Sequence, residues 1–124
     1  MSLQEIGSAK YASLTTFRKD GRGVATPLWV LPAGSGVAFW TTTDSWKVKR
    51  VRNNPHVTVA PCDFRGNLQG PTVEGRARIA DDAERDHFAK VLGRKYWLTG
   101  RFGVIRYRLS RRPARITVIV VDPA

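Results

Sequence analysis

The sequence predicts a mainly β protein in which six short antiparallel strands close into a barrel with short helices at its ends. A chain of 124 residues is long enough for one domain with its own core, so we treat residues 1–124 as a single domain. An apolar fraction of 42% and a charged fraction of 25% are globular values. Six apolar, β-rich segments recur along the chain between turn signals, which is typical of a compact barrel.

The first half predicts three strands joined by tight turns. Residues 11–17 are rich in β-formers and end before Asp20-Gly21, a strong hairpin signal. Further strands are predicted over residues 24–32 and 37–43, separated by the sequence AGSG. Strands with such short connections form an antiparallel meander.

The next segment, residues 46–54, predicts a helix of about two turns. Asp44 and Ser45 are both good N-caps, Val48 and Val51 share one face, and Pro55 closes the segment. Strands follow over residues 56–62, 72–80 and 116–122, with a loop over 63–71.

Two helices are predicted between the last two strands. Asp81 and Glu84 form a capping-box pattern, and Phe88, Val91 and Leu92 supply an apolar stripe behind it. Residues 98–109 also place apolar side chains on one helical face, although Gly100 and Gly103 oppose a helix.

The charge is strongly positive and uneven. The chain has 21 basic and 10 acidic residues, for a net charge of +11. More than half of the cations fall in two clusters, Lys47, Lys49, Arg50 and Arg52, and Arg94, Lys95, Arg101, Arg106, Arg108, Arg111, Arg112 and Arg115. This favours a polyanionic partner, which could be nucleic acid, a phosphorylated cofactor or an acidic substrate; a merely solvated surface is the alternative.

The start of the helix over residues 46–54 is a candidate anion site. Lys47 lies in the first turn, where the helix dipole already places positive charge, and Arg50 follows it on the same side. A phosphate bound by backbone N–H groups, the Ser45 hydroxyl and Lys47 would relieve this repulsion. The threonines at 41–43 could add hydroxyl donors, and a solvated basic helix is the competing interpretation.

Other classes of site find little support. One cysteine and two histidines at unrelated positions do not suggest a metal centre, and nothing in the spacing of Asp63 and Glu74 makes them an acid and base pair. The N-terminus lacks the pattern of a secretory signal, and Pro and Gly interrupt the longest uncharged run, so we expect a cytoplasmic protein that does not cross a membrane.

Several motifs together resemble the pyridoxamine 5′-phosphate oxidase-like flavin and deazaflavin proteins, a split β-barrel family. They are ATPLW (25–29), FWTTTDSWKVKRVRNNP (39–55), VTVAPCD (57–63) and GPTVEGRARI (70–79), and they cover most of the chain. The likeness is greatest to the actinobacterial, mycobacterial-type F420-dependent oxidoreductases. It implies a six-stranded antiparallel split β-barrel, the FMN-binding fold, in a homodimer with two sites at the subunit interface.

The resemblance also implies positions for the cofactor. The tricyclic ring would lie along the strand at Thr26–Trp29, and the phosphate near the start of the helix. The opposite subunit would contribute residues after the fourth strand and near the start of the fifth. The cofactor-binding residues expected on this basis are Thr26, Pro27, Leu28, Trp29, Thr41, Thr42, Thr43, Ser45, Trp46, Lys47, Lys49, Arg50, Pro61, Cys62, Asp63 and Gly70.

Departures from the oxidase pattern leave the cofactor open between coenzyme F420 and FMN. Trp46-Lys47 stands where pyridoxamine phosphate oxidases have Arg-Lys, and the pattern that grips pyridoxal phosphate is missing. F420, with its phosphate and acidic tail, suits a chain of charge +11 better than FMN alone. The expected activity is hydride transfer from reduced F420 to a small acceptor with a C=C or C=N bond. The first alternative is an FMN-binding protein or cofactor carrier of the same fold. The second alternative is a nucleic-acid-binding barrel.

No protein residue is expected to act as a nucleophile, because the cofactor delivers the hydride. Trp29 and Trp40 could wall a substrate pocket, although large aromatics in a small barrel more often belong to the core. Cys62 follows an apolar strand and is expected to be buried rather than reactive.

Overall fold

The computed structural model of the protein describes residues 1–95 and 116–124. The helix predicted over 98–109, and the cations from Arg101 to Arg115, lie outside these residues. In chain order the described elements are α1 (Leu3–Ile6), β1 (Tyr11–Phe17), β2 (Gly23–Ala33), β3 (Gly36–Thr42), α2 (Trp46–Asn53), β4 (His56–Cys62), β5 (Val73–Ile79), α3 (Asp82–Lys95) and β6 (Ile116–Pro123).

The six strands form a closed antiparallel barrel in the order β1-β2-β3-β6-β5-β4. This confirms the predicted mainly β fold, and each predicted strand is present within one or two residues of its expected bounds. The alternation predicted for the fifth strand is also confirmed, because Gly75 and Ala77 are buried while Glu74, Arg76 and Arg78 are exposed.

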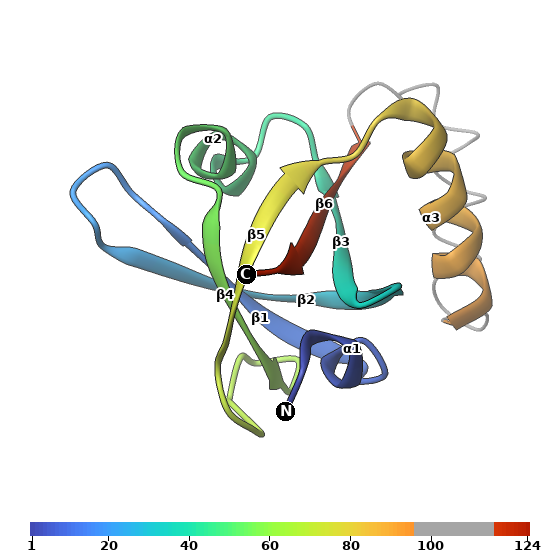
Figure 1. The fold of residues 1–124 in the computed structure, drawn as a ribbon, viewed down its shortest axis with the longest axis horizontal. Coiled ribbons are helices and arrows are strands. Elements are labelled where there is room, and N and C mark those ends of the chain that lie inside the picture. The colour runs from blue at the N-terminus through green and yellow to red at the C-terminus, as the bar shows by residue number, and fades with distance from the viewer. Residues whose placement is uncertain (96–115) are drawn as a thin grey trace.

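Short helices close the barrel and cover one of its faces (Figure 1). The interior core holds apolar side chains of the strands together with Leu3 and Ile6 of α1 and Val48 and Val51 of α2. Phe88 and Leu92 of α3 cover a second cluster on the outer face of β2, β3 and β6. Trp29 and Trp40 pack at the edge of this second cluster, as expected for core aromatics.

The helix starts show what local sequence signals specify. The capping box predicted for α3 is confirmed, since Glu84 N–H donates to Asp81 Oδ1 at 2.8 Å and Asp81 N–H donates to Glu84 Oε1 at 3.3 Å. Helix α1 was not predicted, because four residues give too little periodicity. Its signal was nevertheless present, as Ser2 and Glu5 form a reciprocal capping box.

Strands β2 and β3 separate halfway along their length. They pair only from Val30↔Phe39 to Ala33↔Gly36. Before that point residues 23–29 of β2 pair with β1, and beyond it Trp40–Thr42 of β3 pair with β6. Within the described residues, this split leaves the stretch Thr26–Leu28 without a strand neighbour on the side of β3.

None of the helices in residues 1–95 and 116–124 is long and apolar enough to cross a membrane.

Candidate functional site

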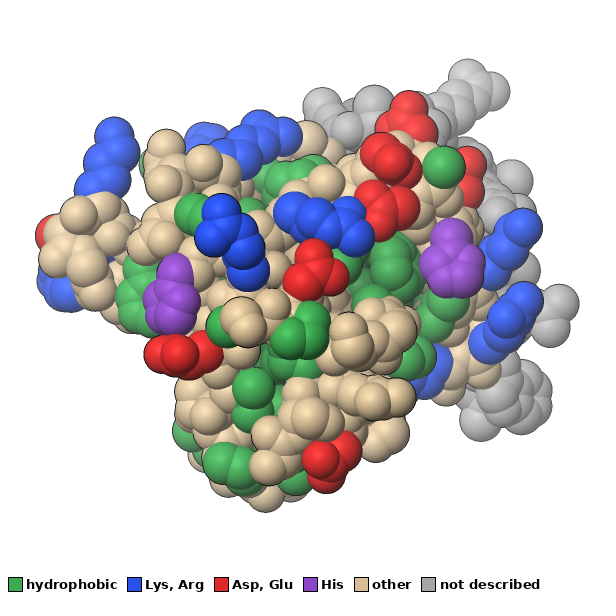
Figure 2. Space-filling model, in the orientation of Figure 1, with side chains coloured by type: hydrophobic (Ala, Val, Ile, Leu, Met, Phe, Trp, Pro, Cys, Tyr) green, Lys and Arg blue, Asp and Glu red, His purple; other side chains and the backbone are tan. Residues whose placement is uncertain are grey.

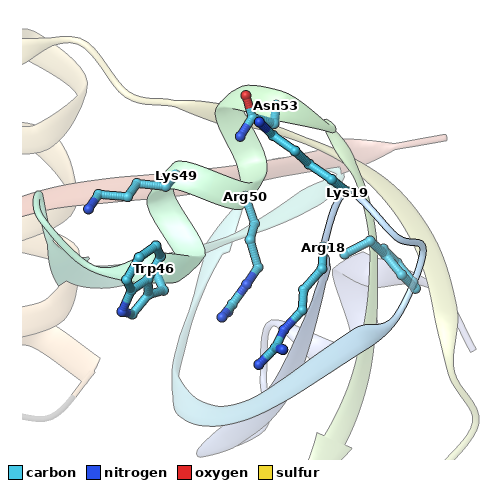
Figure 3. A pocket seen from close by; sticks show the side chains of 7 residues that line it. Arg18, Lys19, Trp46, Lys49, Arg50 and Asn53 are labelled. Atoms are coloured by element: carbon cyan, nitrogen blue, oxygen red, sulfur yellow. The ribbon is translucent and has the colours of Figure 1, made fainter.

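A cleft of about 580 Å³ lies between α2 and the turn that joins β1 to β2 (Figure 3). This size falls in the range of small-molecule sites. Two successive turns of α2 line one wall. Their lining residues have the spacing i, i+3, i+4 and i+7 and are Trp46, Lys49, Arg50 and Asn53. The other wall comes from the strand end and turn, and its residues are Phe17, Arg18 and Lys19.

The walls combine aromatic surface with positive charge. Trp46 is 69% exposed, and Lys49 Nζ lies 4.4 Å from the centroid of its ring. Phe17 stacks on His56 with ring centroids 5.4 Å apart, which fixes its side of the cleft. An aromatic surface of this kind can receive a flat ring while the cations hold an anion beside it.

Among the residues that the structure describes, no acidic side chain forms an ion pair with these cations, although Asp20 interacts electrostatically with Arg18. Among the described residues, the recorded ion pairs involve Arg22, Arg78 and Arg85, and none involves a cation of the cleft or of α2. Figure 2 shows basic side chains over α2 and the β1–β2 turn, whereas a group of acidic side chains lies at the start of α3. The cleft is therefore suited to an anionic ligand.

Lys47 lies beside this cleft rather than in its lining. It is partly buried, and burial together with the nearby charge of Arg50 lowers the pKa of its ammonium. The repulsion between two like charges disfavours the protonated form of the lysine, and an anion that binds between the two groups relieves it. The repulsion predicted between Lys47 and Arg50 is thus present in the structure.

Ser45 occupies the N-cap position of α2, as predicted, but its side chain does not cap the helix. Its Oγ atom is buried and has no hydrogen-bond partner within the described part of the chain. A buried hydroxyl without a partner costs free energy, and a bound ligand can supply one. Ser45 Oγ therefore fits a phosphate at the start of α2.

The predicted cofactor-binding residues fall into three groups. The first group lies around the start of α2. Its members in the cleft lining are Trp46, Lys49 and Arg50, and its members where β3 passes into α2 are Thr41–Thr43, Ser45 and Lys47. Thr26–Trp29 lie on β2 at the split from β3. The part of β2 that lacks β3 as a neighbour begins at Gly23, which pairs with Phe17 of the cleft wall, and β3 ends at Thr42, shortly before α2 begins at Trp46.

The third group lies elsewhere in the chain. Pro61 and Cys62 are at the end of β4 that pairs with the start of β1, whereas the cleft lies beside Phe17 at the other end of β1. Gly70 belongs to the loop after β4, since β5 begins only at Val73. The Asp63 carboxylate accepts from Arg65 N, Asn67 N and Asn67 Nδ2 at 2.9 Å each, so it organises this loop. One chain does not bring these residues to the cleft.

Sequence reasoning missed Phe17, Arg18, Lys19 and Asn53. Asn53 could have been found, because it continues the i, i+3, i+4, i+7 face of α2. The three residues of the turn could not, since only barrel closure brings the end of β1 opposite α2. The charge run RKDGR was their one local signal.

The closed six-stranded antiparallel barrel with its short helices is consistent with the split β-barrel fold of the predicted family, and comparisons with known proteins agree. The sequence matches the family model for pyridoxamine 5′-phosphate oxidase over residues 3–124. The chain therefore belongs to the pyridoxamine 5′-phosphate oxidase family. No curated protein matches the sequence significantly.

Solved structures with the same fold have varied descriptions. A conserved hypothetical protein of Mycobacterium tuberculosis is 21% identical, with a TM-score of 0.69, and the match covers 99% of this chain and 81% of that one. A protein described as an F420 reductase is 23% identical, with a TM-score of 0.63 and coverage of 100% and 94%. The haem storage protein HutZ of Vibrio cholerae is 16% identical, with a TM-score of 0.66 and coverage of 100% and 92%. At such identities these structures show the shared fold alone.

Proposed function

We propose that the protein is an F420-dependent oxidoreductase that transfers a hydride from reduced F420 to a small organic acceptor. The observation that carries the proposal is the cation-lined cleft, whose cations form no ion pair among the described residues and which lies where the stretch of β2 that is split from β3 begins, since Gly23 pairs with Phe17 of the cleft wall. F420 combines a flat ring with a phosphate and an acidic tail, and the cleft offers matching chemistry for each. The F420 reductase among the structures of the same fold is consistent with this choice.

The residues of the chain fit such a cofactor at three points. The edge of β2 at Thr26–Leu28 offers backbone groups to the polar rim of a ring, and Pro27 has no N–H there that would need a partner. Ser45 Oγ has no partner of its own and can donate to a phosphate oxygen. Lys47 supplies an ammonium whose pKa is lowered by burial and then by the charge of Arg50, and a bound anion would favour its charged form.

In this mechanism the protein positions its ligands. Reduced F420, when bound, supplies the hydride. The strand edge of β2 would hold the ring and the anion-binding side chains at the start of α2 would hold the phosphate, so that an acceptor could be held against the ring. Because both reactants are bound in the reactive orientation, the transfer does not depend on a bimolecular encounter in solution. No nucleophilic side chain is needed.

The same proposal includes a homodimer in which a second subunit completes the site. Phe64 is 64% exposed and Leu68 is 58% exposed on the loop after β4. Beside them, a hollow of about 170 Å³ on the outer face of β1, β2 and β4 is lined largely by small side chains, among them Ser13, Ala25 and Ala60. Small side chains and exposed apolar ones suit close contact with another chain. The partner would bring Pro61–Asp63 to the cleft.

The first prediction concerns Lys47. Purified protein should change the fluorescence of F420 at low micromolar protein, and Lys47→Ala should weaken the affinity several-fold, because an ammonium–phosphate contact is lost. The matched control is Arg52→Ala, which removes one cation from the same helix outside the cleft lining. Equal losses in the two variants would show that only net charge matters.

FMN is titrated in parallel, because it shares the ring and phosphate chemistry. Protein that purifies yellow with bound FMN, and that ignores F420, would replace the F420 assignment by the flavoprotein alternative. Binding of neither cofactor, together with a salt-sensitive shift of DNA or RNA in a gel, would favour a nucleic-acid-binding barrel.

A further inference from the structure

A second hollow, of about 530 Å³, lies between α1, the end of β2 and the last turns of α3. This size is again in the range of small-molecule sites. Among the described residues, none lines both this α1–α3 hollow and the cleft beside α2. Helices α1 and α2 lie on opposite sides of the barrel (Figure 1), so the two sites are separate.

The walls of the α1–α3 hollow are joined to one another. Gly7 approaches Pro32 so closely that a Cβ atom at this glycine would lie 3.2 Å from Pro32 Cα. Lys95 Nζ donates to Gly7 O and Val30 O at 2.7 Å each, and also to Ala9 O. The end of α3 is therefore attached to the end of α1 and to β2. A site whose walls are fixed in this way loses little freedom when it binds a ligand.

The lining combines apolar surface with hydrogen-bonding side chains. Pro32 and Val91 supply the apolar surface, and the exposed polar side chains are Gln4, Ser8 and Arg94. Within the described part of the chain, two cations and no acidic residue line the hollow. This arrangement favours an anionic ligand that also has an apolar body.

Arg94 is the cation that can contact such an anion. It lies on the same face of α3 as Val91, three positions further along the helix. The ion pairs recorded among the described residues do not involve Arg94. Glu5, the acidic residue of α1, accepts instead from Ser2 N at 3.1 Å and Ser2 Oγ at 3.2 Å. Lys95 directs its ammonium to backbone carbonyls, so it contributes its positive field rather than a contact.

We propose that the α1–α3 hollow binds a small organic acid, a carboxylate carried on a compact apolar body. The planar guanidinium of Arg94 presents paired N–H donors to the carboxylate, and the Gln4 amide can add another donor. Pro32 and Val91 contact the apolar body. The inference is independent of the proposed function, because it uses no residue assigned to the cofactor.

Benzoate is the probe that tests the proposal, and NMR of the backbone amides follows its binding. Benzoate should shift the amide signals of Gly7, Ser8 and Arg94 in wild type. Benzamide keeps the ring without the charge and should bind about tenfold more weakly. Acetate keeps the charge without the ring and should also bind about tenfold more weakly, because most of the apolar contact is lost.

Two variants of the lining and one control identify the site. Arg94→Ala should remove the preference for benzoate over benzamide, and Ser8→Trp should block benzoate by placing a large side chain in the hollow at an exposed position. Lys90→Ala removes a positive charge from α3 outside the lining and should bind benzoate as wild type does. Circular dichroism of every variant shows that the barrel is folded.

Several results would overturn the proposal. One is the absence of amide shifts at about 20 mM benzoate, well above the millimolar range expected for so small a ligand. Another is a set of shifts confined to Trp46 and Arg50, which would place benzoate in the cleft beside α2. Equal affinity for benzoate and benzamide, or equal losses in Arg94→Ala and Lys90→Ala, would show that Arg94 does not bind the carboxylate.

Discussion

Lys95 is a cation that the fold uses to join three segments. Its Nζ donates to the backbone carbonyls of Gly7 and Val30 at 2.7 Å each, and also to Ala9 O. These carbonyls belong to the end of α1, the link to β1, and the point on β2 where pairing with β1 has ended. The last residue of α3 is thereby attached to the barrel.

Burial lowers the pKa of Lys95 from 10.5 to about 8, while its three carbonyl acceptors act against this shift. From pH 8 to 10.5 the unfolded chain then keeps a proton that the folded protein has released. Stability rises with pH wherever the unfolded state binds more protons, so this group's contribution increases over that interval.

The free energy of unfolding of wild type and of Lys95→Met can be compared by urea denaturation from pH 7 to pH 10. Wild type should gain stability relative to the variant as pH rises, because the variant lacks the titrating group. Lys90→Met changes an exposed lysine of the same helix and should follow wild type. A wild-type advantage that is constant or falls over this interval would show that the carbonyls hold the ammonium charged.

At the scale of elements, the loop between β4 and β5 depends on Asp63. Hydrogen bonds from the side chain and backbone of Asn67, with those of Arg65 and Gly66, lower the pKa of Asp63. The loop then returns to β4, where Gln69 N–H donates to Pro61 O at 2.8 Å and Leu68 bridges to Cys62. It covers Cys62, which is 3% exposed.

Asp63→Ala should therefore speed the reaction of Cys62 with a thiol reagent such as DTNB by several-fold. Cys62 is the single cysteine of the chain, so the readout has one source. Burial, and then the charge of Asp63, raises the pKa of the Cys62 thiol. Asp63→Asn removes the charge but keeps a hydrogen-bond acceptor for the loop, so it separates the effect of charge from the effect of the loop. Asp86→Ala is the control on α3. A rate equal to wild type in Asp63→Ala would mean that the loop protects Cys62 without this carboxylate.

Elements with their own local pattern were predictable from sequence. The six strands and the helix starts at Ser45 and Asp81 follow from alternation and capping residues, which act within a few positions. Helix α1 was missed because its four residues are held by tertiary contacts of Leu3 and Ile6 rather than by periodicity.

The candidate site was predictable only in part, for a physical reason. The α2 residues share one helix, so charge and spacing identify them. Arg18 and Lys19 are nearly thirty positions away in the chain and reach the cleft only through barrel closure. The unpartnered Ser45 hydroxyl could not be seen either, because the sequence predicts a side chain that caps α2.

At the scale of the whole molecule, one chain holds an incomplete version of the site implied by the family resemblance. The cleft and the split lie at one end of β1, and Pro61–Asp63 lie at the other. In Figure 1 the loop after β4 and helix α2 are correspondingly on opposite sides of the barrel. The proposed function therefore requires a second subunit.

A crystal structure of the protein with F420 tests the central claim most directly. We predict density for the ring along Thr26–Trp29 and for the phosphate near Ser45 and Lys47, beside the cleft, with Pro61–Asp63 of a second chain next to the ring. Density placed elsewhere, with the cleft open to solvent and no second chain near it, would contradict the proposal.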